Sequence, residues 1–171
     1  MAFFILTGAA GHASAPVIPS ITSSVTGYNA VPAQTDGDPT TTASGAFSNP
    51  NIVAARSRDL AETLPFGTVV AIESAARTDE CGMTLVAPSI GYRVIADTMN
   101  ARIVNTVDVL FAVDDTIVVH GKQVNAARAL GVCNEVTIRV VGKLDITKPS
   151  KLPKTQAELV ALFGTPALAF K

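Results

Sequence analysis

The sequence contains no tryptophan, and only 5% of its 171 residues are aromatic. A carbohydrate-binding platform of stacked aromatic rings is therefore not expected, although a polar cleft could still bind a sugar. The chain also lacks a basic surplus, because 13 lysines and arginines stand against 14 aspartates and glutamates. Since nucleic-acid binders owe much of their affinity to such a surplus, we expect no nucleic-acid partner.

Long hydrophobic runs are also missing. No stretch approaches the about 20 apolar residues that a membrane-spanning helix needs, so we expect no membrane span. The first ten residues are mostly apolar, and the Ala13-Ser14-Ala15 that follows them has the form of a signal-peptidase site. Residues 1–15 therefore resemble a signal peptide, with a linker over residues 16–24, and export would make the protein secreted or periplasmic and associated with the cell wall. The alternative is a disordered or loosely packed apolar N-terminus, because no lysine or arginine precedes the run.

Cysteine is scarce, with Cys81 and Cys133 as the two examples. An even pair in an exported domain is readily oxidised, and a disulfide closing a loop of about 50 residues would stabilise the fold by about 3–4 kcal/mol. The alternative is two separate buried thiols. We expect no metal site, because only His12 and His120 could complete one, and no motif implies a cofactor.

The middle of the chain has the pattern of short strands. Its apolar residues come in short runs separated by Gly, Pro, Asn and Asp, which is typical of strands rather than helices. Only residues 123–130 differ, because Val124, Ala127 and Leu130 recur at three-residue spacing before Gly131, which predicts a helix. The expected strands are residues 24–30, 52–55, 68–73, 83–87, 92–96, 107–112 and 135–141, with 116–119 as a further candidate.

A sheet of this size with so little helix to cover it must bury its faces on itself. We therefore expect a mainly β fold, either a closed barrel or a sandwich, with a small barrel preferred. Residues 145–171 are rich in proline and lysine and are typical of a linker. Within them, Thr155 and Glu158 form a capping box that predicts a short helix ending at Gly164. The sequence leaves open whether this helix docks on the barrel.

Two aspartates stand in or beside apolar runs. Asp97 follows the run 92–96, and Asp108 lies inside the run 107–111. Burying an unpaired carboxylate costs several kcal/mol unless it lines a cleft or finds donors. Strand alternation turns Asp108 away from the side of Val107 and Val109, so it faces either solvent or a groove. Asp97 could instead be a turn residue that bonds the backbone.

Several short segments occur along the chain in a fixed order. They are Val25-Thr26-Gly27-Tyr28-Asn29, Gln34-Thr35-Asp36-Gly37-Asp38-Pro39, Thr42-Ala43-Ser44-Gly45, Ile52-Val53-Ala54-Ala55, Leu64-Pro65-Phe66-Gly67-Thr68, and Asp97-Thr98 with Asp108 eleven residues after Asp97. In this order the segments resemble bacterial three-aspartate (3D) domains of the double-psi β-barrel superfamily, which also holds RlpA-like proteins and membrane-bound lytic transglycosylase A. The resemblance covers about residues 25–141.

The resemblance implies a six-stranded double-psi β-barrel over residues 25–144, with one short helix and a C-terminal helical tail. It also implies an enzyme that cleaves peptidoglycan or a related β-1,4-glycan without a cofactor. Asp108 would be the general acid, reused as a base in a lytic transglycosylase, and Asp97 would polarise its surroundings. Thr26, Gln34 and Thr42 would bind the substrate. An acid working near neutral pH must keep its proton through desolvation or a nearby like charge, so we expect one carboxyl of the pair to have a raised pKa.

Two features depart from the family. Its first aspartate stands five residues before the proline, whereas Asp59 precedes Pro65 by six, so the place of Asp59 in the site is left open. Active members often carry glycines and a lysine after the second aspartate, where this chain has Met99-Asn100-Ala101-Arg102. The alternative function is therefore a non-catalytic barrel that binds wall glycan or a protein partner.

Overall fold

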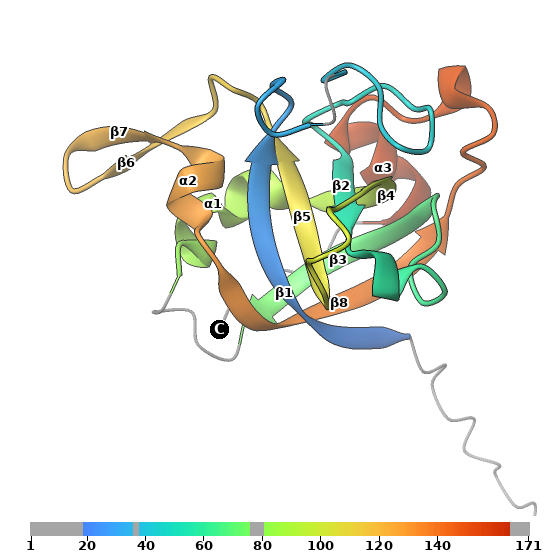
Figure 1. Ribbon diagram of the computed structural model, residues 1–171, viewed down its shortest axis with the longest axis horizontal. Helices are drawn as coiled ribbons and strands as arrows, with labels where there is room; N and C mark the ends of the chain where they lie inside the picture. The colour runs from blue at the N-terminus through green and yellow to red at the C-terminus, as the bar shows by residue number, and fades with distance from the viewer. Residues whose placement is uncertain (1–18, 36–37, 76–80, 165–171) are drawn as a thin grey trace, which may run out of the picture.

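The computed structural model describes residues 19–35, 38–75 and 81–164, so the expected signal peptide lies outside the described residues. Within these residues, six strands form a closed barrel in the order β1-β5-β2-β4-β3-β8 (Figure 1). The predictions of a mainly β fold and of a closed barrel are confirmed. The barrel strands are β1 Ser20–Asn29, β2 Val53–Arg56, β3 Thr68–Ala75, β4 Tyr92–Thr98, β5 Thr106–Phe111 and β8 Cys133–Lys143.

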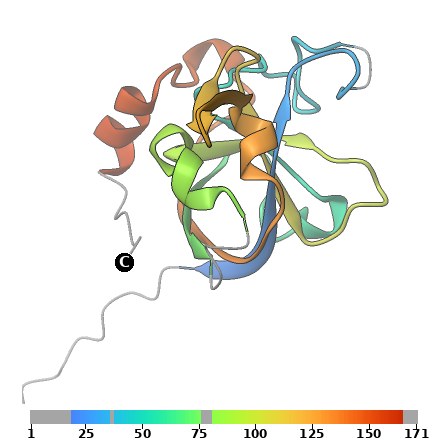
Figure 2. The same cartoon turned by 90° about the vertical axis from the view of Figure 1, so that its left-hand side faces the viewer.

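The remaining elements lie around the barrel. Strands β6 and β7 pair with each other in a hairpin that extends away from the barrel beside α2 (Figure 1). Figure 2 shows α3, in red, lying outside the barrel. These elements are β6 Thr116–Val119, β7 Lys122–Asn125, α1 Met83–Ile90, α2 Ala126–Leu130 and α3 Gln156–Phe163, with short 3-10 turns η1 Arg58–Leu60 and η2 Pro149–Lys151.

The barrel consists of two like halves. Strand β1 runs parallel to β5, and β2 runs parallel to β4. The other neighbours, β1 with β8, β2 with β5, β3 with β4 and β3 with β8, are antiparallel. Exchanging β1 with β4, β2 with β5 and β3 with β8 leaves each pairing and its direction unchanged. The sheet pairing therefore has a pseudo-twofold relation that maps each of the antiparallel pairs β2–β5 and β3–β8 onto itself.

Strand alternation divides the buried side chains into two hydrophobic clusters. The first cluster fills the barrel, because it takes side chains from all six barrel strands and is closed by Met83 of α1 and Leu130 of α2. The second cluster lies on the outer face of β2, β3 and β4, where Leu159 of α3 covers it and is fully buried. The barrel residues of the first cluster include Val25, Ala54, Val70, Ile95, Val107 and Ile138.

Two local predictions are wrong. Residues 83–87 form part of helix α1 instead of a strand, since a short apolar run does not by itself distinguish a buried helix from a strand. Residues 123–130 are helical only from Ala126, because β7 occupies Lys122–Asn125. The Asn125 side chain caps α2 by accepting from the backbone N–H of Arg128, so the helix begins there. Strand β6 forms as expected but lies outside the barrel.

Both ends of the described chain belong to the packed domain. Strand β1 begins at Ser20, so residues 20–24 are part of the barrel rather than of a linker. The C-terminal helix α3 docks on the barrel, and its capping box of Thr155 and Glu158 is present. The Gln156 side chain accepts from the backbone N–H of Tyr92 and donates to the carbonyl oxygens of Tyr92 and Asn51. This amide therefore ties α3 to β4.

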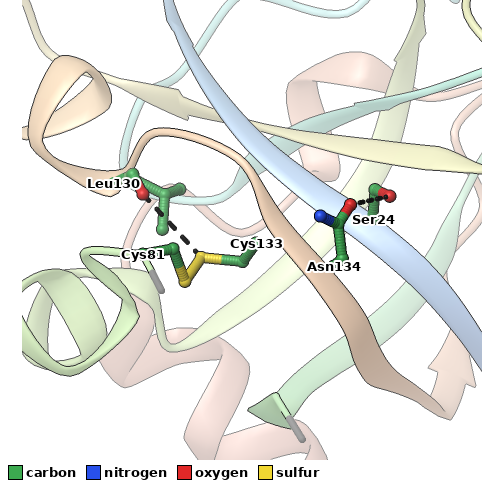
Figure 3. Close-up of a disulfide and its surroundings, with 5 residues drawn as sticks. All are labelled: Ser24, Cys81, Leu130, Cys133 and Asn134. Carbon is green, nitrogen blue, oxygen red and sulfur yellow. Dashed lines mark hydrogen bonds between the residues drawn. A yellow bond between two sulfur atoms is a disulfide. The ribbon is translucent and has the colours of Figure 1, made fainter. Parts of the chain in front are cut away.

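A disulfide joins Cys81, just before α1, to Cys133 at the start of β8 (Figure 3). The two cysteines are 52 positions apart in the sequence. Close to this disulfide, Ser24 of β1 donates a hydrogen bond to Asn134 of β8 (Figure 3). The covalent link therefore fixes the α1 region to a strand that closes the barrel.

We predict that replacing both cysteines, Cys81→Ala with Cys133→Ala, lowers the free energy of unfolding by about 3–4 kcal/mol, because the unfolded chain regains the freedom of the closed loop. Urea denaturation of the oxidised protein and of the double variant measures the difference. A reductant should destabilise the wild-type protein and leave the double variant unchanged. Equal stability of the oxidised protein and the variant would contradict a stabilising role for this disulfide.

Candidate functional site

Asp108 and Asp97 lie in one row that crosses four neighbouring strands. Thr26 of β1 is paired with Asp108 of β5, which is paired in turn with Ala55 of β2. Ala55 is paired on its other side with Asp97 of β4. Because neighbouring strands lie about 4.8 Å apart, the Cα atoms of the two aspartates are about 10 Å apart, with Ala55 between them.

A bulge in β4 brings Asp97 onto the same face as Asp108. Ile95 is paired with Ala54, but Asp97 is paired with Ala55, so Ala96 is an extra residue in β4. In a regular strand, Asp97 would share the side of Ile95, which lies in the barrel interior. The extra residue turns Asp97 to the outer face, where it lines a cleft together with Asp108.

This cleft has a volume of about 480 Å³. Its floor comes from the row of strand residues, and its walls come from the β1–β2 connection and from residues that follow Asp97. Among the described residues that line it, the charged ones are the three carboxylates Asp38, Asp97 and Asp108 and the exposed cation Arg58. The other lining residues are Tyr28, Ala33, Gln34, Thr35, Thr41, Ala43, Ser48, Ala55, Thr98, Met99 and Asn100. The cleft is therefore polar and mainly acidic.

Asp108 sits half-buried at the floor of the cleft. The Thr26 hydroxyl donates to its Oδ1 at 2.7 Å, which leaves Oδ2 as the oxygen that can carry a proton. Burial raises the pKa of the Asp108 carboxyl to about 6, and the charge of Asp97 adds to this rise while the Thr26 hydrogen bond opposes it. Asp108 therefore holds its proton in a pH range where an exposed aspartic acid is ionised.

Asp97 has a different environment, because three donors surround its carboxylate. The Tyr28 hydroxyl donates to Oδ2 at 3.1 Å, and the backbone N–H groups of Ala43 and Thr98 donate to Oδ1 at 2.9 Å each. Burial and the neighbouring Asp97 raise the pKa of Tyr28 above its usual value, so its hydroxyl remains a donor. The geometry holds Asp97 as an oriented acceptor in the same cleft as Asp108.

Tyr28 lines the cleft and contacts Asp97, but it is not among the site residues that the sequence predicts. It stands two residues after Thr26 on β1, and residues i and i+2 of a strand share a face. That spacing, within the same motif, was the available signal. Its ring belongs to the outer cluster, while its hydroxyl reaches the carboxylate of Asp97.

The three predicted substrate-binding residues differ in how they relate to the cleft. Gln34 lines the cleft, and its Oε1 accepts from the backbone N–H of Asn29. Thr26 reaches the site through its hydrogen bond to Asp108. Thr42 is buried beside the cleft, and its hydroxyl donates to the carbonyl oxygen of Ala46 instead of lining the hollow.

Asp59, whose match to the first aspartate of the family the sequence left open, does not line the cleft. It belongs to η1, and its Oδ2 accepts from the backbone N–H of Asn105 at 2.9 Å. Among the residues that the structure describes, no group of three or more His, Cys, Asp and Glu side chains could hold a metal ion. None of the described helices is both long and apolar enough to cross a membrane.

Comparisons of the chain with protein-family models, with curated proteins and with solved structures found no match. The resemblance to three-aspartate domains therefore stays a prediction from the motifs in the sequence. The chemical interpretation of the site depends on the cleft and on the different surroundings of its two carboxyl groups.

We predict that Asp108→Asn stabilises the protein at pH 7.5 by about 1–3 kcal/mol and gives no gain at pH 4. The folded protein holds the Asp108 proton more tightly than the unfolded chain, so the free energy of unfolding of the wild type falls as the pH rises from about 4 through about 6. Asparagine removes this ionisation, and its amide oxygen can still accept from Thr26. Urea denaturation at a series of pH values measures the difference.

The matched control is Asp59→Asn. Asp59 is exposed, and hydrogen bonds from Ser57 and from the backbone of Asn105 lower its pKa. This variant should therefore lose a little stability at neutral pH, which is the opposite sign. If Asp108→Asn gains nothing between pH 4 and pH 7.5, Asp108 is not a desolvated acid.

Proposed function

We propose that this protein is an exported enzyme that cleaves cell-wall glycan, and that it is a lytic transglycosylase acting on peptidoglycan or a related β-1,4-glycan. The observation that carries the proposal is that one cleft holds two carboxyl groups in unlike surroundings. Asp108 is desolvated and keeps its proton to about pH 6, whereas Asp97 is fixed by three donors. Such a difference is typical of sites that carry out acid/base chemistry.

In the first step, Asp108 donates its proton to the glycosidic oxygen, and the bond from this oxygen to the anomeric carbon breaks. The positive charge that develops on the sugar ring is stabilised by the negative charge of Asp97 in the same cleft. In the second step, the Asp108 carboxylate takes the proton from the sugar's own 6-hydroxyl. The freed oxygen attacks the anomeric carbon and closes an anhydro ring, so no water is consumed and Asp108 regains its proton.

The surroundings of Asp97 support this route over one with a covalent intermediate. Both oxygens of the Asp97 carboxylate accept hydrogen bonds, Oδ2 from the Tyr28 hydroxyl and Oδ1 from the backbone N–H groups of Ala43 and Thr98. These donors stabilise the carboxylate charge and weaken Asp97 as a nucleophile. Asp97 is therefore assigned to orientation and charge stabilisation, with Asp108 as the single acid and base.

The double-psi description of the barrel and the export of the protein are parts of the same proposal. Two parallel pairs, β1 with β5 and β2 with β4, related by the pseudo-twofold exchange, support a barrel made of two interlocked similar halves. The disulfide between Cys81 and Cys133 suits an oxidising compartment, which supports a secreted or periplasmic location.

A second candidate function is a non-catalytic barrel that binds wall glycan or a protein partner. The observation that favours it is that Met99 and Asn100 line the cleft at the place where active family members often carry glycines. Their side chains occupy space that a sugar could otherwise use. The two candidates differ in whether a bond is broken, so a product assay separates them.

We predict that the purified protein releases anhydro-sugar fragments from peptidoglycan and that Asp108→Asn lowers the rate by at least about 100-fold, because the amide cannot donate the proton. The rate should fall as the pH rises through about 6, where Asp108 loses its proton. Mass spectrometry of the fragments, collected at a series of pH values, measures both effects.

Asp59→Asn is the control for this assay, because Asp59 lies outside the cleft, and its rate should match the wild type. Fragments with reducing ends would indicate hydrolysis instead of transglycosylation. Binding without any cleavage would support the non-catalytic barrel, and full activity of Asp108→Asn would refute the role given to this residue.

A further inference from the structure

A second cleft lies on the same outer face of the barrel, next to the candidate site, and has a volume of about 650 Å³. Its strand lining includes Val53 of β2 and Ala96 of β4, whereas the candidate site takes Ala55 and Asp97 from the same two strands. Val53 and Ala55 are two residues apart, which is about 7 Å along a strand. The two hollows are therefore neighbours.

One short loop separates the two clefts. Its residues Thr41, Ala43 and Ser48 line the candidate site, while Phe47 and Asn49 line the second cleft. Thr41 and Phe47 form an isolated β-bridge, which holds the loop in a narrow arch. An extended ligand bound in the candidate site therefore reaches the second cleft by crossing this loop alone.

The far wall of the second cleft is built by the segment before α3. Leu152, Pro153 and Lys154 line it, and the Asn49 side chain donates to the carbonyl oxygen of Lys154 at 2.8 Å. The side chain of Gln156, two residues later, is hydrogen-bonded to the barrel as well. Hydrogen bonds at Lys154 and at Gln156 therefore fix this wall to the barrel.

The chemistry of the second cleft differs from that of the candidate site. Valine, isoleucine, alanine, leucine and proline side chains make up most of its lining, and Phe47 stands at its edge with 68% of its surface exposed. Lys154 is the one charged residue among the described residues that line it, and no carboxylate does. Such a cleft suits a ligand with an apolar body and a negatively charged end, and its volume is in the usual range of small-ligand sites.

We propose that the second cleft binds a short apolar peptide that ends in a carboxylate and is attached to the glycan. This inference rests on the proposed function, because the sugar that carries the peptide would lie in the cleft of Asp97 and Asp108. An extended peptide covers about 3.4 Å per residue, so two residues cover the about 7 Å that separates Ala55 of the candidate site from Val53 of the second cleft along β2. The apolar side chains of the peptide contact Phe47 and Val53, and its carboxylate pairs with the Lys154 ammonium.

The test compares glycan strands that carry their peptides with the same strands after the peptides have been removed enzymatically. Binding is measured by calorimetry on the full chain carrying Asp108→Asn, so that no strand is cut. We expect the peptide-bearing strands to bind at least about 10-fold more tightly, because contacts with the second cleft add to those with the sugar.

Phe47→Ala and Lys154→Gln, added separately to this protein, should each reduce the preference for peptide-bearing strands and leave the affinity for bare strands unchanged. Val118→Ala is the matched control for Phe47→Ala, because Val118 is equally exposed, at 67%, but lies on β6 away from both clefts. This control should keep the full preference. The peptide released from the strands, added without any glycan, should bind the wild-type protein and should not bind Phe47→Ala at the same concentration.

The outcomes separate this inference from the proposed function. If the wild-type protein cuts peptidoglycan but binds both kinds of strand equally, the peptide site is wrong and the enzyme stands. If nothing is cut but the preference depends on Phe47 and Lys154, the peptide site stands on a non-catalytic barrel. A preference that survives both substitutions overturns the inference. Concentration-dependent dimers that Phe47→Ala abolishes would assign the cleft to a second copy of the chain and overturn it as well.

Discussion

The extra residue in β4 decides which side chains meet in the cleft. Strand alternation alone would turn Asp97 toward the barrel interior beside Ile95, where a carboxylate would be buried without water. The shift in pairing between Ala54 and Ala55 of β2 turns it outward instead. Asp108 needs no bulge, because it faces outward in a regularly paired part of β5. The candidate site therefore depends on a backbone register, and any change that restores regular pairing in β4 would separate the two carboxyl groups.

The two carboxyl groups then differ because their donors differ. Asp97 receives two backbone N–H groups and the Tyr28 hydroxyl, whereas Asp108 receives one hydroxyl and lies where burial disfavours its charge. The same outer face continues into the apolar cleft beside Phe47, so one side of the barrel carries both an acidic and an apolar hollow. The C-terminal segment contributes the wall of the second hollow, which gives a role to residues that follow the barrel.

The sequence predicts some of these features and leaves others open, for physical reasons. Alternation in the run 107–111 is enough to place Asp108 on the face opposite Val107, and the capping box predicts α3. A bulge depends on the partner strand, so the outward turn of Asp97 cannot be derived from β4 alone. The run 83–87 is short and apolar except for Thr84, so its sequence alone does not distinguish a buried helix from a strand. Thr42 matches a motif, yet its hydroxyl satisfies the carbonyl of a nearby loop residue rather than facing the cleft.

The most direct test is an NMR titration of the Asp108 side-chain carboxyl carbon in the full-length protein, with the Asp108→Asn spectrum identifying the signal. We expect a midpoint near pH 6, because burial and the charge of Asp97 both favour the protonated form. A midpoint near pH 4, the ordinary value of about 3.9 for an exposed aspartic acid, would show that the carboxyl is fully hydrated and would contradict the account.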